Sequence, residues 1–148
     1  VLVRNGNRLI DRLGSILQRV LRFQLVGGED NPHGSYLWQF PSRIALMASG
    51  QRNFVDLCAF GCSHRKRTRL VFYHCGQIML PHFHCVGKRL CAFSGKPHLQ
   101  LSAPRLSCGS QDYPDGLCKF IAATLYAAHQ RRIVAAIETL LRPENRLG

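Results

Sequence analysis

Two apolar segments joined by a dense basic turn constrain the fold of this chain more than any other feature. Residues Asn53–Phe60 (NFVDLCAF) have the composition of a buried strand, and Thr68–His74 (TRLVFYH) have that of a second one. The turn between them is GCSHRKR. Two such segments separated by a short turn predict an antiparallel hairpin, which needs helices or further strands to cover its apolar side chains.

The basic turn is also the first candidate site. Together with the first two residues of the following strand it contributes Arg65, Lys66, Arg67, Thr68 and Arg69. Cations gathered in one turn can hold phosphates or reach the edge of a base, so we interpret these five residues as a nucleic-acid contact. A solvated hairpin tip is the alternative interpretation.

Apolar periodicity predicts a helix over residues 7–22. Its apolar side carries Leu9, Leu13, Ile16, Leu17, Val20 and Leu21. The opposite side carries Arg8, Arg12, Arg19 and Arg22. A solvated face is our interpretation of this arginine stripe, with a phosphate track as the alternative.

A second long helix is predicted over Asp115–Leu141. Pro114 stands just before it, Asp115 is placed to cap it, and Pro143 ends it. Between the two helices we expect a strand over Arg22–Gly28, a ligand-facing loop EDNPHGSYLW, and a helix from Tyr36 to Ala48 that is interrupted or restarted at Pro41.

This order predicts one α/β domain over residues 1–148. We expect a partial doubly wound, Rossmann-like sheet with an antiparallel edge hairpin and a Cys/His-rich irregular segment. Its parts are the helix 7–22, a strand–helix–hairpin core 23–74, the Cys/His-rich segment 75–112 and the C-terminal helix 115–141.

The charge balance points to a polyanionic partner. The 148-residue chain has 20 Lys+Arg against 8 Asp+Glu, a net charge of +12. Such a field favours nucleic acid first and an anionic membrane surface second. No segment reaches the roughly 18 unbroken apolar residues of a membrane-spanning helix, and of the two partners we expect nucleic acid and no membrane. The seven cysteines are odd in number and no secretory signal is visible, which favours a reduced, intracellular compartment.

The Cys/His-rich segment raises the question of a metal. Cys85, Cys91 and His98 offer three soft ligands, although structural zinc sites usually use closer pairs such as Cys-x₂₋₄-Cys. We therefore treat zinc as a candidate cofactor held by these three residues. Buried free cysteines and a loop histidine are the alternative.

Four motifs in order carry a family resemblance. EDNPHGSYLW, FVDLCAFGCSHRKRTRL, CAFSGKPHLQL and DYPDGLCKFIA resemble the C-terminal half of the catalytic domain of phage-type cytosine-5 DNA methyltransferases, and the degenerate copies in retroelement and dinoflagellate open reading frames. The resemblance covers about residues 23–125. It implies that the family acid, which hydrogen-bonds the flipped cytosine, falls on Asp30 or Glu29. It also implies that Arg65, Lys66 and Thr68 contact substrate or support the active site.

Two parts of the family pattern are missing. The family has a catalytic cysteine in a Pro-Cys loop and a Gly-rich loop for S-adenosylmethionine, both N-terminal to the matching region. Neither occurs here, because no cysteine precedes Cys58 and no Pro-Cys pair exists. Without a nucleophile and a methyl donor the chain cannot methylate alone. We therefore expect a non-catalytic or truncated methyltransferase-like domain that binds nucleic acid through its basic hairpin turn.

Two alternatives stay open. The chain is half of an active cytosine-5 DNA methyltransferase, completed by missing N-terminal sequence or another chain that brings S-adenosylmethionine. Or it is a zinc-stabilised accessory module within a larger mobile-element polyprotein. The resemblance favours DNA over RNA as the partner, and a DNA-binding protein would be nuclear.

Overall fold

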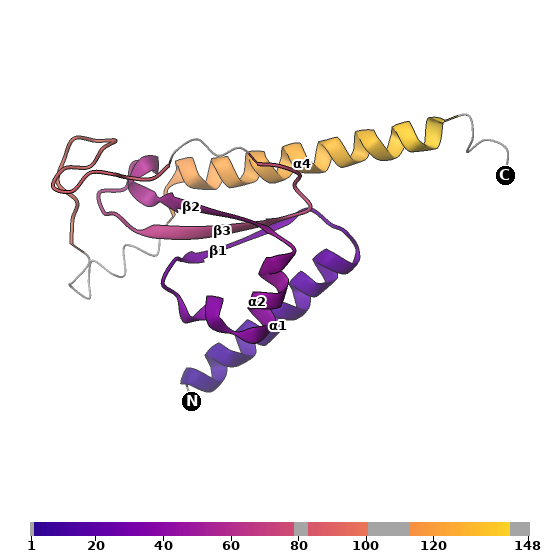
Figure 1. Ribbon diagram of the computed structural model, residues 1–148, viewed down its shortest axis with the longest axis horizontal. Helices are drawn as coiled ribbons and strands as arrows, with labels where there is room; N and C mark the ends of the chain where they lie inside the picture. The colour runs from indigo at the N-terminus through magenta and orange to yellow at the C-terminus, as the bar shows by residue number, and fades with distance from the viewer. Residues whose placement is uncertain (1, 79–82, 101–112, 143–148) are drawn as a thin grey trace.

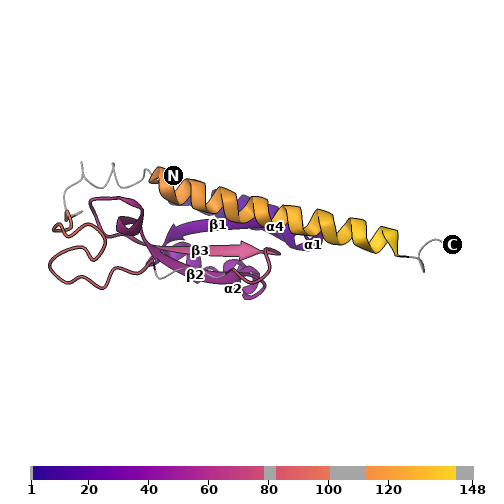
Figure 2. The same cartoon turned by 90° about the horizontal axis from the view of Figure 1, so that it is seen from above.

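The computed structural model describes residues 2–78, 83–100 and 113–142. It is a mixed α/β fold in which a three-stranded sheet has helices on both faces (Figures 1 and 2). The elements in chain order are α1 (Leu2–Arg22), β1 (Gly27–Pro32), the 3₁₀ helix η1 (Tyr36–Gln39), α2 (Pro41–Ala48), β2 (Gln51–Asp56), the 3₁₀ helix η2 (Leu57–Phe60), β3 (Arg67–Tyr73) and α4 (Asp115–Leu141).

The sheet has the order β1-β3-β2, with β3 in the centre. β2 and β3 pair antiparallel, with Asn53 opposite Leu70, which confirms the predicted hairpin. β1 also pairs antiparallel with β3, with Asp30 opposite Leu70. A doubly wound sheet is built from parallel strands and crossover connections. All strand pairs in the described residues are antiparallel, so this part of the predicted fold is not confirmed.

The first strand begins later than predicted. We expected Arg22–Gly28 as the strand and the acidic residues after it as a loop, but β1 runs from Gly27 to Pro32 and contains Glu29. The chain leaves α1 through a tight turn in which Gln24 has a φ of 51° and the Leu25 amide donates to the Val20 carbonyl at 2.8 Å. The two glycines thus start the strand instead of ending it.

Alternation along β3 divides the core into two layers. Val71 and Tyr73 face α1 and α2, whereas Leu70 and Phe72 face α4. The layer below the sheet in Figure 1 contains Leu17, Leu37, Trp38, Leu46 and Met47, and the layer above it contains Val55, Leu57, Leu117 and Ala128. Leu9 and Ile16 of the predicted apolar stripe lie outside the core, with 69% and 59% of their surface exposed.

The C-terminal helix has the predicted bounds, and α2 starts at Pro41, as a second helix start there predicts. One detail differs, because Pro114 is the capping residue of α4 and no side chain caps it. The predicted strand Asn53–Phe60 is also shorter, since residues Leu57–Phe60 turn into η2. The distal half of α4 extends beyond the sheet (Figures 1 and 2). None of the described helices is both long and apolar enough to cross a bilayer.

Candidate metal centre

Four potential metal ligands converge at the end of the sheet where β2 stops. They are Cys58, Cys85, Cys91 and His98, and their ligand atoms all lie within 4.8 Å of one another. The three cysteines form a small buried cluster of their own, and His98 is half-buried at its side. The structure thus brings together the three residues that the sequence predicted as metal ligands, and adds Cys58 as a fourth.

The spacing of these atoms fits a tetrahedral zinc ion. With Zn–S about 2.3 Å and Zn–N about 2.0 Å, two sulfurs of a tetrahedron stand about 3.8 Å apart, and a sulfur and a nitrogen about 3.5 Å apart. The Cys85 Sγ–Cys91 Sγ distance is 4.0 Å, and Cys85 Sγ lies 3.6 Å from His98 Nε2. Little movement is therefore needed for these three side chains to share one ion.

Backbone contacts to β2 hold Cys85 in place. The Asp56 amide donates to the Phe83 carbonyl at 2.9 Å, and the Cys85 amide donates to Asp56 Oδ2 at 2.8 Å. Cys58 follows Asp56 closely, inside η2. The end of β2 therefore positions Cys58, which follows it directly in the chain, and Cys85, which is hydrogen-bonded to the Asp56 carboxylate.

A second turn carries Cys91. The Cys91 amide donates to the Lys96 carbonyl at 2.8 Å, and the Gly95 amide donates to the Cys91 carbonyl at 2.9 Å. Gly95 has a φ of +68°, which glycine adopts without strain. An isolated bridge between Leu90 and Pro97 closes this turn and places His98 just beyond it.

Gly87 is required between Cys85 and Cys91. A Cβ at this position would lie 1.8 Å from the Leu90 carbonyl oxygen, so the backbone here leaves no room for a side chain. The chain can fold back tightly enough to bring the two sulfurs together only because Gly87 has none.

Backbone amides point at the sulfurs. The Ala92 amide donates to Cys85 Sγ and the Phe93 amide donates to Cys91 Sγ, each at 3.4 Å. Burial alone would raise the pKa of Cys91, but hydrogen bonds from the Ser94 side chain and from the Phe93 and Ser94 amides lower it to about 6. These donors favour a thiolate, the form of cysteine that binds metals.

Cys58 shows the opposite tendency. Burial raises its pKa, and its hydrogen bonds with Cys91 and Cys85, together with the charges of those two groups, raise it further. Three buried thiolates this close repel one another, so they cannot all be ionised without a compensating cation. A divalent metal supplies that compensation, which makes the donor set chemically suited to one.

The predicted nucleic-acid contact residues run from the turn before β3 into its first three residues, and their side chains have different settings. Arg65 and Arg67 both face the fully buried Asp56: Arg67 donates to both carboxylate oxygens at 3.1 Å, and Arg65 Nε lies 3.4 Å from Oδ2. Although burial opposes it, the Arg67 hydrogen bond and the Cys85 amide lower the pKa of Asp56. Lys66 is half-buried, and its carbonyl accepts from the Leu57 amide at 3.1 Å.

The other two residues of that set are less accessible. Thr68 is fully buried, so its side chain is not on the surface. Arg69 stacks on Trp38 at 4.9 Å and on Phe54 at 5.4 Å from the ring centroids, on the sheet face opposite α4. The structure therefore leaves the side chains of Arg65 and Arg67 as the most exposed cations of the turn, at 39% and 40%.

The two predicted acids occupy opposite faces of β1. Glu29 is buried against α2, where it forms an ion pair with the fully buried Arg43 and accepts a hydrogen bond from Tyr73 Oη at 2.5 Å. Asp30 lies on the α4 side beside Tyr113, and burial together with the hydrogen bond between Tyr113 and Asp30 raises the pKa of Tyr113. The Glu29 carboxylate therefore interacts with Arg43 and Tyr73 in the buried layer between the sheet and α2.

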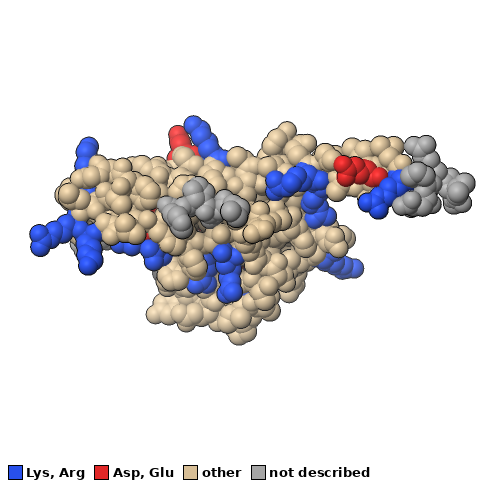
Figure 3. Space-filling model, turned by 45° about the horizontal axis from the view of Figure 1, so that its top comes forward, with Lys and Arg blue, Asp and Glu red and all other residues tan. Residues whose placement is uncertain are grey.

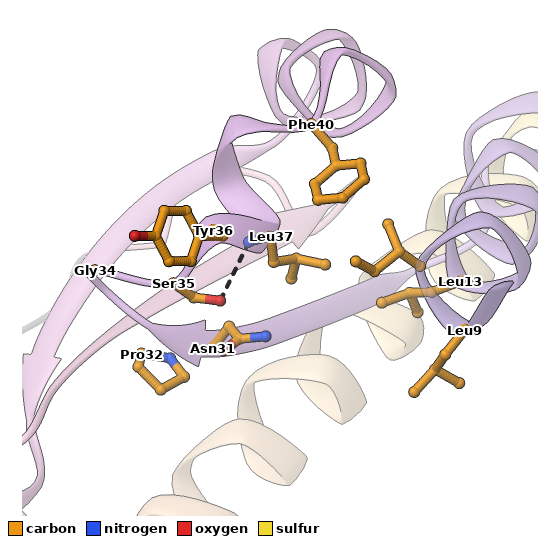
Figure 4. Close-up of a pocket in the computed structure, with 10 residues that line it drawn as sticks. Leu9, Leu13, Asn31, Pro32, Gly34, Ser35, Tyr36, Leu37 and Phe40 are labelled. Carbon is orange, nitrogen blue, oxygen red and sulfur yellow. Dashed lines mark hydrogen bonds between the residues drawn. The ribbon is translucent and has the colours of Figure 1, made fainter. Parts of the chain in front are cut away.

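A separate apolar groove of about 770 Å³ lies between α1 and the segment that leads from β1 into η1 (Figure 4). Leu9 and Leu13 line it from α1, and Tyr36 and Phe40 from the other side. Ser35 Oγ accepts from the Leu37 amide at 3.2 Å and so fixes the start of η1 there. The described residues that line this groove include no charged side chain, which separates it chemically from the cationic end of the molecule.

Comparisons of the chain with protein-family models, curated proteins and solved structures find no match. Cys58 is the candidate ligand that sequence reasoning missed. It lies far from the other three in the chain, inside a segment that reads as a buried strand, and its closely spaced partner in the sequence, Cys58-x₃-Cys62, is a different cysteine. Part of the predicted Cys/His-rich segment, residues 79–82 and 101–112, lies outside the described residues.

Proposed function

We propose that this protein is a zinc-stabilised domain that binds nucleic acid through the basic surface beside its metal centre. The observation that carries the proposal is the convergence of Cys58, Cys85, Cys91 and His98 within 4.8 Å. Four protein ligands leave no open coordination position, which is typical of structural and not catalytic zinc. When bound, the ion would neutralise the thiolates and cross-link the segment.

The need for a cross-link follows from the local structure. Residues 83–100 contain no regular helix or strand beyond the single Leu90–Pro97 bridge. They attach to the rest of the fold through a few hydrogen bonds and through Phe83, which packs on Phe60 and Phe120. An ion held by Cys58 on one side and by Cys85, Cys91 and His98 on the other would fasten this segment to the end of the sheet. Structural zinc contributes folding energy in this way.

Charge supports nucleic acid as the partner. The net charge is +12, and Figure 3 shows Lys and Arg side chains projecting from the end of the molecule opposite the C-terminus, where the segment 83–100 lies in Figure 1. Of the eight acidic residues, Glu29 and Asp56 are buried and already paired with arginines. Each of these carboxylates is neutralised together with one arginine, so the net charge of +12 is left to the other ionisable residues.

The methyltransferase resemblance supports a second proposal, that the domain is a relic or an incomplete half of such an enzyme. Its support is the order of the four motifs along the chain. The antiparallel pairing of β1 with β3 and the engagement of Glu29 by Arg43 weigh against a working cytosine site in the described residues. We therefore place zinc-dependent structure and nucleic-acid binding ahead of catalysis.

Elemental analysis of the purified protein tests the metal. We expect about one zinc per chain, and a loss of most of it in Cys58→Ser and in Cys91→Ser. The matched control is Cys118→Ser, because Cys118 is exposed on α4 and should leave the zinc content unchanged. A zinc content near zero in the wild type, or equal in all three variants, would contradict the proposal.

Salt dependence tests the partner. If about four cations each displace a counterion from duplex DNA, log K should fall with log salt at a slope near −4. An affinity that stays flat between low and physiological salt would count against nucleic-acid binding.

A further inference from the structure

A polar pocket of about 360 Å³ opens directly beside the metal centre. The basic turn and the Cys/His segment build it jointly. Its lining consists of Arg65, Gly87, Lys88, His98, Leu99 and Gln100. Among the described residues no acid lines it, whereas two cations and a candidate metal ligand do.

The positive charge of Arg65 is available to this pocket. Its acidic neighbour is Asp56, whose two oxygens are already taken by Arg67 in a bidentate pair, with the Cys85 amide on Oδ2 as well. One buried carboxylate therefore faces two guanidinium groups, so a full positive charge is left over. The Arg65 side chain is 39% exposed and can turn its remaining donors outward.

Lys88 supplies the second charge. It is exposed, and it forms no ion pair with any residue in the described ranges. Gly87 next to it can carry no side chain, because a Cβ would lie 1.8 Å from the Leu90 carbonyl oxygen. The wall of the pocket at this point is therefore backbone, and a ligand can approach it closely.

His98 connects the pocket to the metal centre. Its Nε2 lies 3.6 Å from Cys85 Sγ, so Nε2 is the atom placed to ligate a metal. Ligation through Nε2 keeps the proton on Nδ1, which then acts as a hydrogen-bond donor in a fixed ring orientation. The Gln100 amide can add further donors. Two permanent cations with convergent N–H donors are the groups that recognise a phosphate.

We propose that this pocket binds a phosphate group of the nucleic-acid backbone, and that metal binding completes it by fixing His98. The inference rests on the proposed nucleic-acid function and names the site of one contact. Free inorganic phosphate shares the same chemistry and serves as an independent probe of the pocket.

The first arm of the test is DNA binding by the double variant Arg65→Gln/Lys88→Gln, measured by fluorescence anisotropy of a labelled duplex over a series of salt concentrations. Loss of one phosphate contact should reduce the salt slope by about 0.9 and weaken binding about eight-fold near 0.1 M salt. The matched control is Arg8→Gln/Arg12→Gln, which removes the same charge from the exposed face of α1. We expect the control to change affinity less than about two-fold, because it removes no phosphate contact of the pocket.

The second arm follows the imidazole NMR resonances of His98 in the zinc-loaded protein during titration with inorganic phosphate. They should shift in the wild type and not in the pocket variant. The zinc content and the thermal midpoint of each variant show whether its fold is intact. If the double variant unfolds, the single variant Lys88→Gln replaces it in both arms.

The arms separate the two hypotheses. Equal loss of DNA affinity in the pocket variant and the α1 control, with no response of His98 to phosphate, would overturn the pocket. A wild type that binds no DNA, but whose His98 responds to phosphate only when Arg65 and Lys88 are present, would overturn the nucleic-acid function and keep the pocket as a site for free phosphate.

Discussion

Removing Arg43 should destabilise this protein more than any surface substitution, because it would leave the Glu29 carboxylate buried without its cation. Arg43 is fully buried and pairs with Glu29, whose side chain is 5% exposed and also accepts a hydrogen bond from Tyr73. Breaking a buried ion pair by deleting one partner costs about 3–5 kcal/mol, since the other charge is left uncompensated. We expect Arg43→Ala to lower the free energy of unfolding by this amount.

Urea unfolding monitored by far-UV circular dichroism measures the effect. With an m value of about 2 kcal/mol/M, a loss of about 4 kcal/mol lowers the midpoint by about 2 M. Tyr73→Phe removes only one hydrogen bond to a charged group and should cost about 1.5–3 kcal/mol. The double variant Glu29→Gln/Arg43→Met removes both charges together, and it should be clearly more stable than Arg43→Ala.

The ranking of the three variants decides the interpretation. If Arg43→Ala unfolds within about 0.5 M urea of the wild type, the pair is not buried in solution as the structure has it. If the double variant is no more stable than Arg43→Ala, lost packing and not an uncompensated charge explains the effect. The first result would contradict the buried Glu29–Arg43 pair, and the second would contradict its electrostatic contribution to stability.

Two further predictions concern the Cys/His segment. Removal of the metal by a chelator should lower the thermal midpoint of the protein, because the ion ties the segment 83–100 to the sheet. The same segment should then become the first site of proteolysis. An unchanged cleavage pattern would show that no ion holds the segment. Gly87→Ala should reduce the zinc content and the stability, because the added Cβ would lie 1.8 Å from the Leu90 carbonyl oxygen. The control is Gly34→Ala, whose added Cβ meets nothing within 4 Å and should change neither quantity. Zinc analysis and thermal melting compare the two variants.

The elements that were predictable from sequence have strong local signals. The long helix Asp115–Leu141 is marked by prolines at both ends, and the β2–β3 hairpin by two apolar runs around a basic turn. Pro41 similarly marks the start of α2. In these cases backbone restriction or alternation within a few residues decides the structure, so tertiary contacts have little to override.

The features that the sequence did not predict depend on contacts between residues far apart in the chain. EDNP has a turn composition, yet it is a strand because β3 supplies its partners, with Glu29 opposite Val71 and Asp30 opposite Leu70. Cys58 joins the metal cluster only because η2 turns the chain at the end of β2 toward Cys85. Neither relation leaves a pattern in the local sequence, and both positions matter for the candidate sites.

Zinc K-edge X-ray absorption on the purified protein tests the central claim most directly, because it reports the identities and distances of the atoms around the metal. We predict three sulfurs at about 2.3 Å and one nitrogen at about 2.0 Å, supplied by Cys58, Cys85, Cys91 and His98. In Cys58→Ser, which should lose most of its zinc, the zinc that stays bound should have one sulfur fewer in its shell. A shell of oxygen and nitrogen atoms without sulfur, or one that Cys58→Ser leaves unchanged, would contradict the metal centre described here.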